Sequence, residues 1–182
     1  MRRGTLLWML ALVGCASGGG AGRAPVSQTV RVIGPTATQS IPLTSGADAS
    51  SSRALPYTVE RVWRTLPSVL DSLGIPIQTM DPAKRVAGNA GFKVRGRLKN
   101  VPLSRYIDCG NSTGIGPNAD TYEVHMVFLA AVQPAEGNSS SVSLTFEAMA
   151  KPVNFAQDYS QCSSRAVLET RLFDLLAARL AS

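Results

Sequence analysis

Thiol and imidazole side chains, which bind zinc and serve as nucleophiles or bases, are few in this sequence: three cysteines and one histidine. Cys15 lies near the start of the chain, whereas Cys109 and Cys162 lie in its second half. A cysteine sulfur can form a thioether, a disulfide or a metal bond. Two cysteines and His125 do not make a convincing zinc ligand set, and a Cys-x-x-Cys redox motif is absent from the sequence. We therefore predict no metal and no cofactor, and we expect the thiols to form covalent links.

Cys15 follows a segment that is typical of a secretory signal peptide. Arg2 and Arg3 precede the apolar run at residues 5–13, which is too short to span a bilayer as a stable helix. The sequence LVGC at positions 12–15 then resembles the lipobox of bacterial lipoproteins, in which an aliphatic residue and small residues precede an acylated cysteine. The resemblance implies cleavage before Cys15 and attachment of lipid to its thiol. The alternative is an ordinary signal peptide with an unmodified cysteine after it.

The lipobox resemblance also predicts how the chain is processed and where it resides. Residues 1–14 are the predicted signal peptide, and residues 15–27, rich in small residues, are a flexible acylated tether. Because residues 1–14 contain two arginines and no acidic residue, their removal lowers the net charge from +6 to +4. An aspartate after the cysteine tends to retain lipoproteins in the inner membrane. Ala16 therefore favours the periplasmic face of the outer membrane within the bacterial cell envelope.

Cys109 and Cys162 are predicted to form a disulfide. They are the two cysteines that remain once Cys15 carries lipid, and an even pair in an exported protein is typical of a disulfide. The bond would close a loop of 53 residues. The chain-entropy estimate for a loop of this length is about 4 kcal/mol of stabilisation.

Four cations recur at every second position between residues 93 and 99, namely Lys93, Arg95, Arg97 and Lys99. On one continuous strand, all four side chains would project from one face. An anion-binding stripe for lipid headgroups or an acidic partner has this pattern. Alternating cations occur more often on the solvated outer face of a half-exposed sheet. Nucleic acid is not an expected partner, because the predicted compartment lies outside the cytoplasm and no surface aromatics are interleaved with the cations.

His125 is the only histidine and would have to serve as the base of any Ser-His-Asp hydrolase. It lies in a predicted strand with apolar neighbours, and the sequence contains no G-x-S-x-G motif. The glycine-rich segments at 88–91 and 114–116 lack the Lys-Ser/Thr of a phosphate-binding loop, and we interpret them as turns. We therefore predict that the protein is not an enzyme, with a hydrolase that uses His125 as a remaining alternative.

Two amphipathic helices are among the elements that must position these residues. In residues 58–73, the apolar residues lie at offsets of 0, 3, 4, 7, 10, 11 and 14 when counted from Val59. This spacing places them on one continuous helix face. Thr58 and Gly74 are suitable caps, and Pro67 should bend the helix. A second helix is predicted from a cap at Ser163 or Ser164 to about residue 180, with a leucine-rich inner face.

Alternating hydrophobicity and turn residues predict the strands. The Ser/Thr/Gly-rich segment 36–53 and the glycine-rich segment 110–120 are predicted as loops. Gly88 and Gly91 indicate a bend or bulge. Strands are expected at residues 28–33, 75–80, 86–98, 104–109, 121–132 and 141–150, the last two forming a hairpin.

With 45% hydrophobic and 16% charged residues, the chain is predicted to fold, with residues 28–182 forming a single α+β domain. An antiparallel sheet of four to six strands would be packed by the two helices, because its apolar face must be covered. This element order resembles the helix-grip fold. Together with the lipid anchor, it resembles the helix-grip domains of the C subunit of the outer-membrane β-barrel assembly machine. The resemblance implies a fold and a compartment, but no functional residue.

The sequence thus predicts a lipid-anchored envelope lipoprotein that acts as a non-enzymatic binding or assembly-accessory module. Its expected partners are the membrane, through the lipid, and another envelope protein. One alternative is a carrier that holds a lipid or small hydrophobic ligand in a groove between sheet and helix. A wide apolar cavity would favour the carrier, a filled core the binding module, and a buried polar cluster at His125 the hydrolase.

Overall fold

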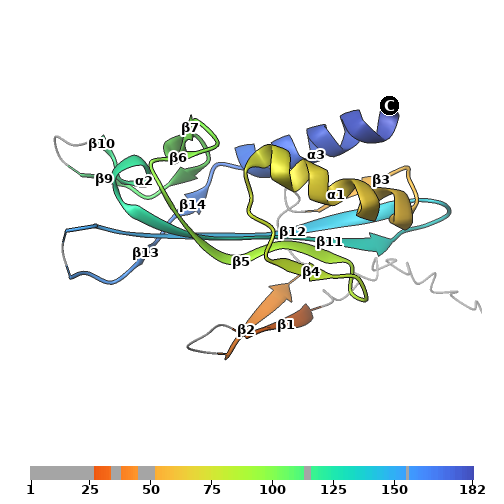
Figure 1. Ribbon diagram of the computed structural model, residues 1–182, viewed down its shortest axis with the longest axis horizontal. Coiled ribbons are helices and arrows are strands. Elements are labelled where there is room, and N and C mark those ends of the chain that lie inside the picture. The colour runs from red at the N-terminus through yellow and green to blue at the C-terminus, as the bar shows by residue number, and fades with distance from the viewer. Residues whose placement is uncertain (1–26, 34–37, 45–51, 113–115, 155) are drawn as a thin grey trace, which may run out of the picture.

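The computed structural model describes residues 27–33, 38–44, 52–112, 116–154 and 156–182, and it is an α+β structure (Figure 1). Its main sheet is antiparallel with the strand order β13-β12-β11-β5-β4, and β3 pairs with β12 as a sixth strand. The predicted fold class is therefore confirmed. The six strands are β3 (Ser52–Leu55), β4 (Thr79–Asp81), β5 (Val86–Arg95), β11 (Glu123–Pro134), β12 (Ser140–Lys151) and β13 (Ser160–Gln161).

Two helices, α1 (Val59–Leu73) and α3 (Val167–Ala181), cover one face of this sheet and lie against each other (Figure 1). The predicted caps of α1 are confirmed. The Thr58 hydroxyl accepts a hydrogen bond from the Arg61 backbone N–H, and Gly74 ends the helix in the left-handed conformation with φ of +80°. Pro67 lies inside α1, which continues on both sides of it.

The β11–β12 hairpin is confirmed and forms the centre of the sheet, with twelve opposed residue pairs between Glu123–Pro134 and Ser140–Lys151. Alternate residues of β11 enter the core beneath the helices, in contact with those of β12 and with the apolar faces of α1 and α3. The buried residues that β11 contributes to this core are Val124, Met126, Phe128, Ala130 and Val132. The core between sheet and helices is therefore filled with side chains.

Strand β5 carries the predicted bulge. The register between β5 and β11 shifts between Met126 and Phe128, opposite the glycine-rich segment 88–91. Asn89 is buried within this bulge, where its amide donates to the Pro76 carbonyl and its side-chain oxygen accepts from the Gly91 N–H. The buried amide thus satisfies backbone groups that the irregular pairing leaves without a ladder partner.

The predicted loop at 36–53 is wrong in two places. Residues Thr38–Thr44 form β2, which pairs with β1 (Ser27–Ile33) in a separate two-stranded sheet, and β3 begins at Ser52. The predicted strand at 28–33 is confirmed as β1. The segment is rich in Ser and Thr, and threonine is compatible with both strands and loops, so composition alone misjudged it.

The region between β5 and β11 is more finely divided than predicted. The predicted strand at 104–109 is a 3₁₀ turn followed by two strand residues. Before β5, the predicted strand at 75–80 is also shorter than predicted and is reduced to β4. The predicted loop at 110–120 contains two short paired strands and one helical turn. These elements are β6 (Arg97–Leu98), β7 (Val101–Pro102), η1 (Leu103–Arg105), β8 (Ile107–Asp108), β9 (Asn111–Ser112), β10 (Gly116–Pro117) and α2 (Asn118–Thr121).

Helix α3 begins later than predicted. Ser163 and Ser164 form β14 (Ser163–Ser164), which pairs with β8, and Ala166 precedes the helix in the left-handed conformation. The Ser164 hydroxyl still serves the helix start: it accepts from the Ala166 N–H and donates to the buried Glu169 carboxylate. Because Ser164 belongs to β14, the residue at the N-cap position of α3 is Ala166 and not the predicted serine.

Candidate functional site

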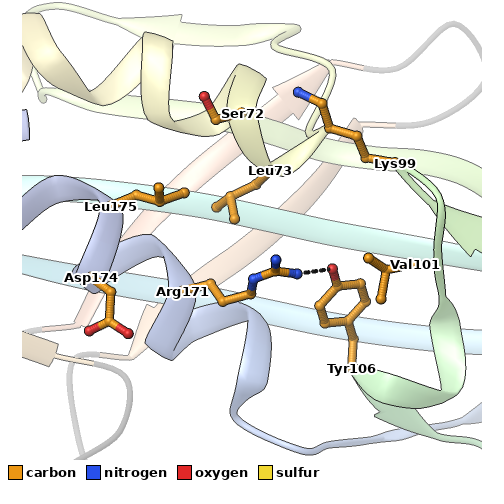
Figure 2. Close-up of a pocket in the computed structure, with 8 residues that line it drawn as sticks. All are labelled: Ser72, Leu73, Lys99, Val101, Tyr106, Arg171, Asp174 and Leu175. Carbon is orange, nitrogen blue, oxygen red and sulfur yellow. Dashed lines mark hydrogen bonds between the residues drawn. The ribbon is translucent and has the colours of Figure 1, made fainter. Parts of the chain in front are cut away.

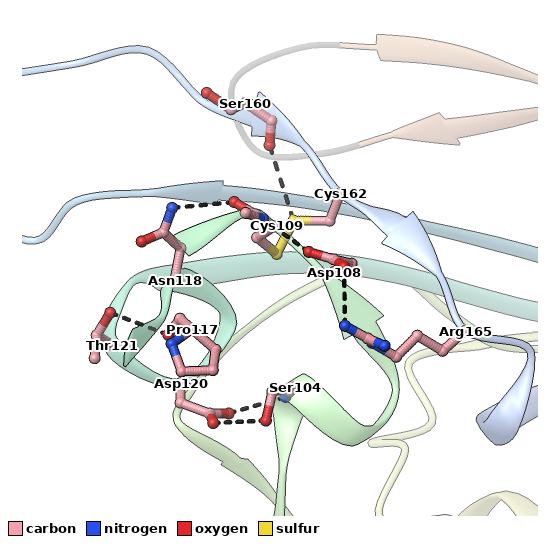
Figure 3. The surroundings of a disulfide bond; sticks show 11 residues. Ser104, Asp108, Cys109, Pro117, Asn118, Asp120, Thr121, Ser160, Cys162 and Arg165 are labelled. Carbon is pink, nitrogen blue, oxygen red and sulfur yellow. Dashed lines mark hydrogen bonds and ion pairs between the residues drawn. A yellow bond between two sulfur atoms is a disulfide. The ribbon is translucent and has the colours of Figure 1, made fainter. Parts of the chain in front are cut away.

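The predicted disulfide between Cys109 and Cys162 is confirmed (Figure 3). It joins the residue after β8 to the residue between β13 and β14, with 4.3 Å between the two Cα atoms. Next to it, the Asp108 carboxylate pairs with the Arg165 guanidinium at 2.8 Å. The bond thus attaches the irregular region after β5 to the segment that leads into α3.

The four alternating cations do not form one stripe, so that part of the prediction is wrong. Strand β5 ends at Arg95, and Gly96 adopts a φ of +65°, which breaks the two-residue alternation. Beyond the break, the Arg97 guanidinium donates to the Asn100 carbonyl, and the Lys99 ammonium donates to the Asp71 carbonyl at the end of α1. Of the four cations, only Lys93 and Arg95 lie in a strand of the main sheet, and they share one face of it.

On that face, Lys93 and Arg95 belong to a cluster around one carboxylate. The Glu123 carboxylate lies 3.0 Å from the Lys93 ammonium, 3.7 Å from the Arg95 guanidinium and 4.0 Å from the Lys151 ammonium. The Tyr159 hydroxyl donates to the same carboxylate at 2.8 Å. We call Lys93, Arg95, Glu123, Lys151 and Tyr159 the Glu123 cluster. It lies on the sheet face opposite the helices, because Glu123 alternates with the core residues of β11.

The cluster keeps its carboxylate ionised. The hydrogen bond from the Tyr159 hydroxyl, followed by that from Lys93, lowers the pKa of Glu123 below its ordinary value of 4.5. The Glu123 carboxylate in turn raises the pKa of Lys93 above 10.5, through its hydrogen bond and its charge. The contribution of Glu123 to stability is therefore present above pH 4.5 and lost as the pH falls through its lowered folded-state pKa. That of Lys93 is present below pH 10.5 and lost as the pH rises through its raised pKa.

In the Glu123 cluster, cations outnumber acids and are more exposed. The Glu123 side chain is 17% exposed, compared with 61% for Lys93 and 59% for Arg95. Glu147 also lies on this sheet face, but further along β12, opposite Val127 rather than opposite the cluster. Three positive charges around one partly covered carboxylate leave a local excess of positive charge at the surface.

His125 lies on the same face as the Glu123 cluster, two residues from Glu123. Its ring contacts Tyr159 edge-on, with 6.3 Å between the ring centroids, and a Cβ placed on Gly91 would lie 2.8 Å from its Nε2. Among the described residues, no hydrogen bond joins His125 to a serine hydroxyl or to a carboxylate. The relay that a Ser-His-Asp hydrolase requires is thus not assembled within the described part of the chain.

A second polar site lies on the helix side of the molecule, in a groove between α1, α3 and the segment from β6 to η1 (Figure 2). The groove has a volume of about 470 Å³. Its apolar wall is formed by Leu73, Val101 and Leu175. Lys99 and Arg171 line the same space, and the Arg171 guanidinium donates to the Tyr106 hydroxyl at 2.7 Å. We call this feature the helix groove.

Sequence reasoning found only part of these two sites. The alternation of cations indicates Lys93, Arg95 and Lys99, but no sequence pattern indicates Lys151, Arg171 or the two tyrosines. Arg171 and Tyr106 are 65 residues apart, and no local pattern indicates that they meet. The one available signal was the exposed cation at position 171 next to the leucine face of the predicted helix.

No protein-family model matches this chain, and no curated protein matches it. Cys15, residues 1–14 and most of the predicted tether at 15–27 lie outside the described residues. Within the described ranges, no helix is long and apolar enough to cross a membrane. In the same part of the chain, no three His, Cys, Asp or Glu side chains come together as potential metal ligands.

Proposed function

We propose that the protein is a lipid-anchored, non-enzymatic binding module of the bacterial envelope, and that the Glu123 cluster turns toward anionic lipid headgroups. The lipobox at residues 12–15 supports the anchor. The observation that supports this orientation is the grouping of Lys93, Arg95 and Lys151 around a single carboxylate on the sheet face opposite the helices. The cluster lies at the start of β11, before the part of this face where Val127 and Leu129 are buried. A domain held by lipid remains close to the surface, so weak attraction is enough to orient it.

The expected electrostatic contribution is modest but measurable. A cation near an anionic membrane surface contributes about 1 kcal/mol, so three cations contribute up to about 3 kcal/mol before Glu123 offsets part of it. Such attraction is screened over a Debye length of about 8 Å at physiological ionic strength. The proposed orientation should therefore depend on salt.

The filled core supports a binding module rather than a carrier with a cavity between sheet and helices. Leu66, Leu70 and Phe128 are completely buried in that layer. The helix groove lies between α1, α3 and residues 99–106, so it is a different site from the predicted groove between the sheet and the helices. A hydrolase that uses His125 gains no support from the described residues around its ring.

We expect the combined substitutions Lys93→Gln, Arg95→Gln and Lys151→Gln to weaken binding to anionic vesicles by up to roughly a hundredfold at low salt. The reason is the loss of three exposed charges from one face. The measurement is co-sedimentation of the chain from residue 16 onward, made without lipid, with vesicles of phosphatidylglycerol and phosphatidylcholine. Conversely, Glu123→Gln should strengthen binding, because it removes the only carboxylate in the cluster.

The matched control removes three exposed cations elsewhere, with Arg64→Gln, Lys84→Gln and Arg105→Gln. This variant has the same net charge as the cluster variant but keeps the Glu123 cluster. If both triple variants lose vesicle binding equally, net charge alone explains the attraction and the proposed orientation is wrong. If neither loses it at low salt, the cluster is simply a solvated face.

A further inference from the structure

We propose that the helix groove is a binding site for a small organic carboxylate with an apolar chain. The carboxylate would pair with Arg171, Lys99 would add positive charge at the same groove, and the chain would lie against Leu73, Val101 and Leu175 (Figure 2). This goes beyond the proposed membrane orientation, which uses the opposite face of the sheet. Helices α1 and α3 lie on one side of the sheet (Figure 1), and Glu123 lies on the other, because it alternates with the core residues of β11 that face the helices. The two sites can therefore be occupied independently.

Arg171 supplies the anion recognition. Its guanidinium donates one hydrogen bond to the Tyr106 hydroxyl, a neutral acceptor, and among the described residues it forms no ion pair. Tyr106 is only 2% exposed, so its hydroxyl is a fixed partner that holds the guanidinium in place. The remaining N–H groups of the planar guanidinium match the two oxygens of a carboxylate.

Lys99 adds a second cation at the same groove. Its ammonium donates to the Asp71 carbonyl at the end of α1, which positions the charge without neutralising it. Among the described residues that line the groove, Asp174 is the one acid. Its side chain points away from the Arg171–Tyr106 pair (Figure 2), and its carboxylate lies 3.8 Å from the Arg53 guanidinium. The groove therefore presents an excess of positive charge to its occupant.

The apolar wall and the size of the groove determine the rest of the ligand. A volume of about 470 Å³ lies within the range of roughly 300–1,000 Å³ that is usual for small-molecule sites. Leu73, Val101 and Leu175 offer hydrocarbon surface beside the cations. An inorganic anion would leave this surface uncovered, and a neutral hydrocarbon would leave Arg171 without an anionic partner. A carboxylate with a short apolar chain would pair with Arg171 and would also cover the apolar wall.

The test is calorimetric titration of the chain from residue 16 onward, made without lipid, which contains every described element. The probes are butanoate, hexanoate and octanoate, all below their micellar concentrations. Affinity should increase by up to about fourfold for each methylene that the groove buries. Octanol, with a chain of the same length but no charge, should bind at least tenfold more weakly than octanoate.

Arg171→Gln should weaken octanoate binding at least tenfold, whereas the control Arg64→Gln, which removes an exposed arginine of α1 outside the groove, should not change it. Tyr106→Phe keeps the buried ring and removes the hydroxyl that orients Arg171, so it should weaken binding several-fold. Thermal unfolding checks that each variant is folded. The proposal is overturned if octanoate binds Arg171→Gln and Tyr106→Phe as it binds the parent, if octanol matches octanoate, or if octanoate shows no saturable binding.

Discussion

Loss of the Cys109–Cys162 disulfide should lower the free energy of unfolding by about 4 kcal/mol. The bond joins residues 53 apart, and opening it lets the unfolded chain explore many more conformations. A decrease of this size is a large part of the 5–15 kcal/mol that typically stabilises a domain. The measurement is urea unfolding of the parent and of the Cys109→Ser, Cys162→Ser double variant, with the midpoint and slope fitted for each.

Reductant provides the control for that comparison. Dithiothreitol should destabilise the parent to nearly the same extent as the double substitution, and it should leave the double variant unchanged. We expect the irregular region after β5 to loosen first, because the disulfide and the Asp108–Arg165 ion pair attach it to the segment before α3. A loss below about 1 kcal/mol would show that native contacts, rather than the covalent loop, hold this region together.

Gly88→Ala should destabilise the protein by about 4 kcal/mol. Gly88 lies in β5 between β4 and β11, and its φ is +144°, a conformation that other residues rarely adopt. A Cβ at this position would lie 2.1 Å from the Phe128 carbonyl oxygen. Because that oxygen belongs to the backbone of the central strand, the sheet itself would have to move. Urea unfolding of the purified variant measures the loss.

Gly137→Ala is the matched control. Gly137 also has a positive φ, of +65°, but a Cβ there would meet nothing within 4 Å. It should cost only about 1 kcal/mol, the conformational penalty for a left-handed residue. Equal losses for the two variants would mean that backbone conformation, and not the contact with Phe128, makes Gly88 necessary.

The parts of the fold that follow from local patterns were predictable. The apolar residues of α1 recur on one helical face, and Thr58 and Gly74 have the chemistry of its two caps, so its limits agree with the prediction to one residue. The β11–β12 hairpin alternates toward a buried face and encloses a polar turn. The disulfide followed from counting cysteines in a predicted exported chain.

The rest depends on residues that are distant in the sequence. Glycine can take either sign of φ, so nothing local indicated that Gly96 would break the row of cations after Arg95. The partners of Lys93 and Arg95 come from β11, and those of Arg171 from the turn after β7. Such clusters form only after strand register and helix packing are fixed, which explains why the candidate sites were only partly found.

We propose that this protein acts at a membrane surface through lipid on Cys15. The most direct test of this proposal is incorporation of radiolabelled fatty acid by bacteria that express the full chain. We expect the parent to become labelled and to migrate as the shortened mature form. Cys15→Ala should remain an unlabelled, full-length precursor, while the Cys109→Ser, Cys162→Ser variant should still be labelled. Label in Cys15→Ala equal to that in the parent, or no label in the parent, would show that Cys15 is not the lipid attachment site.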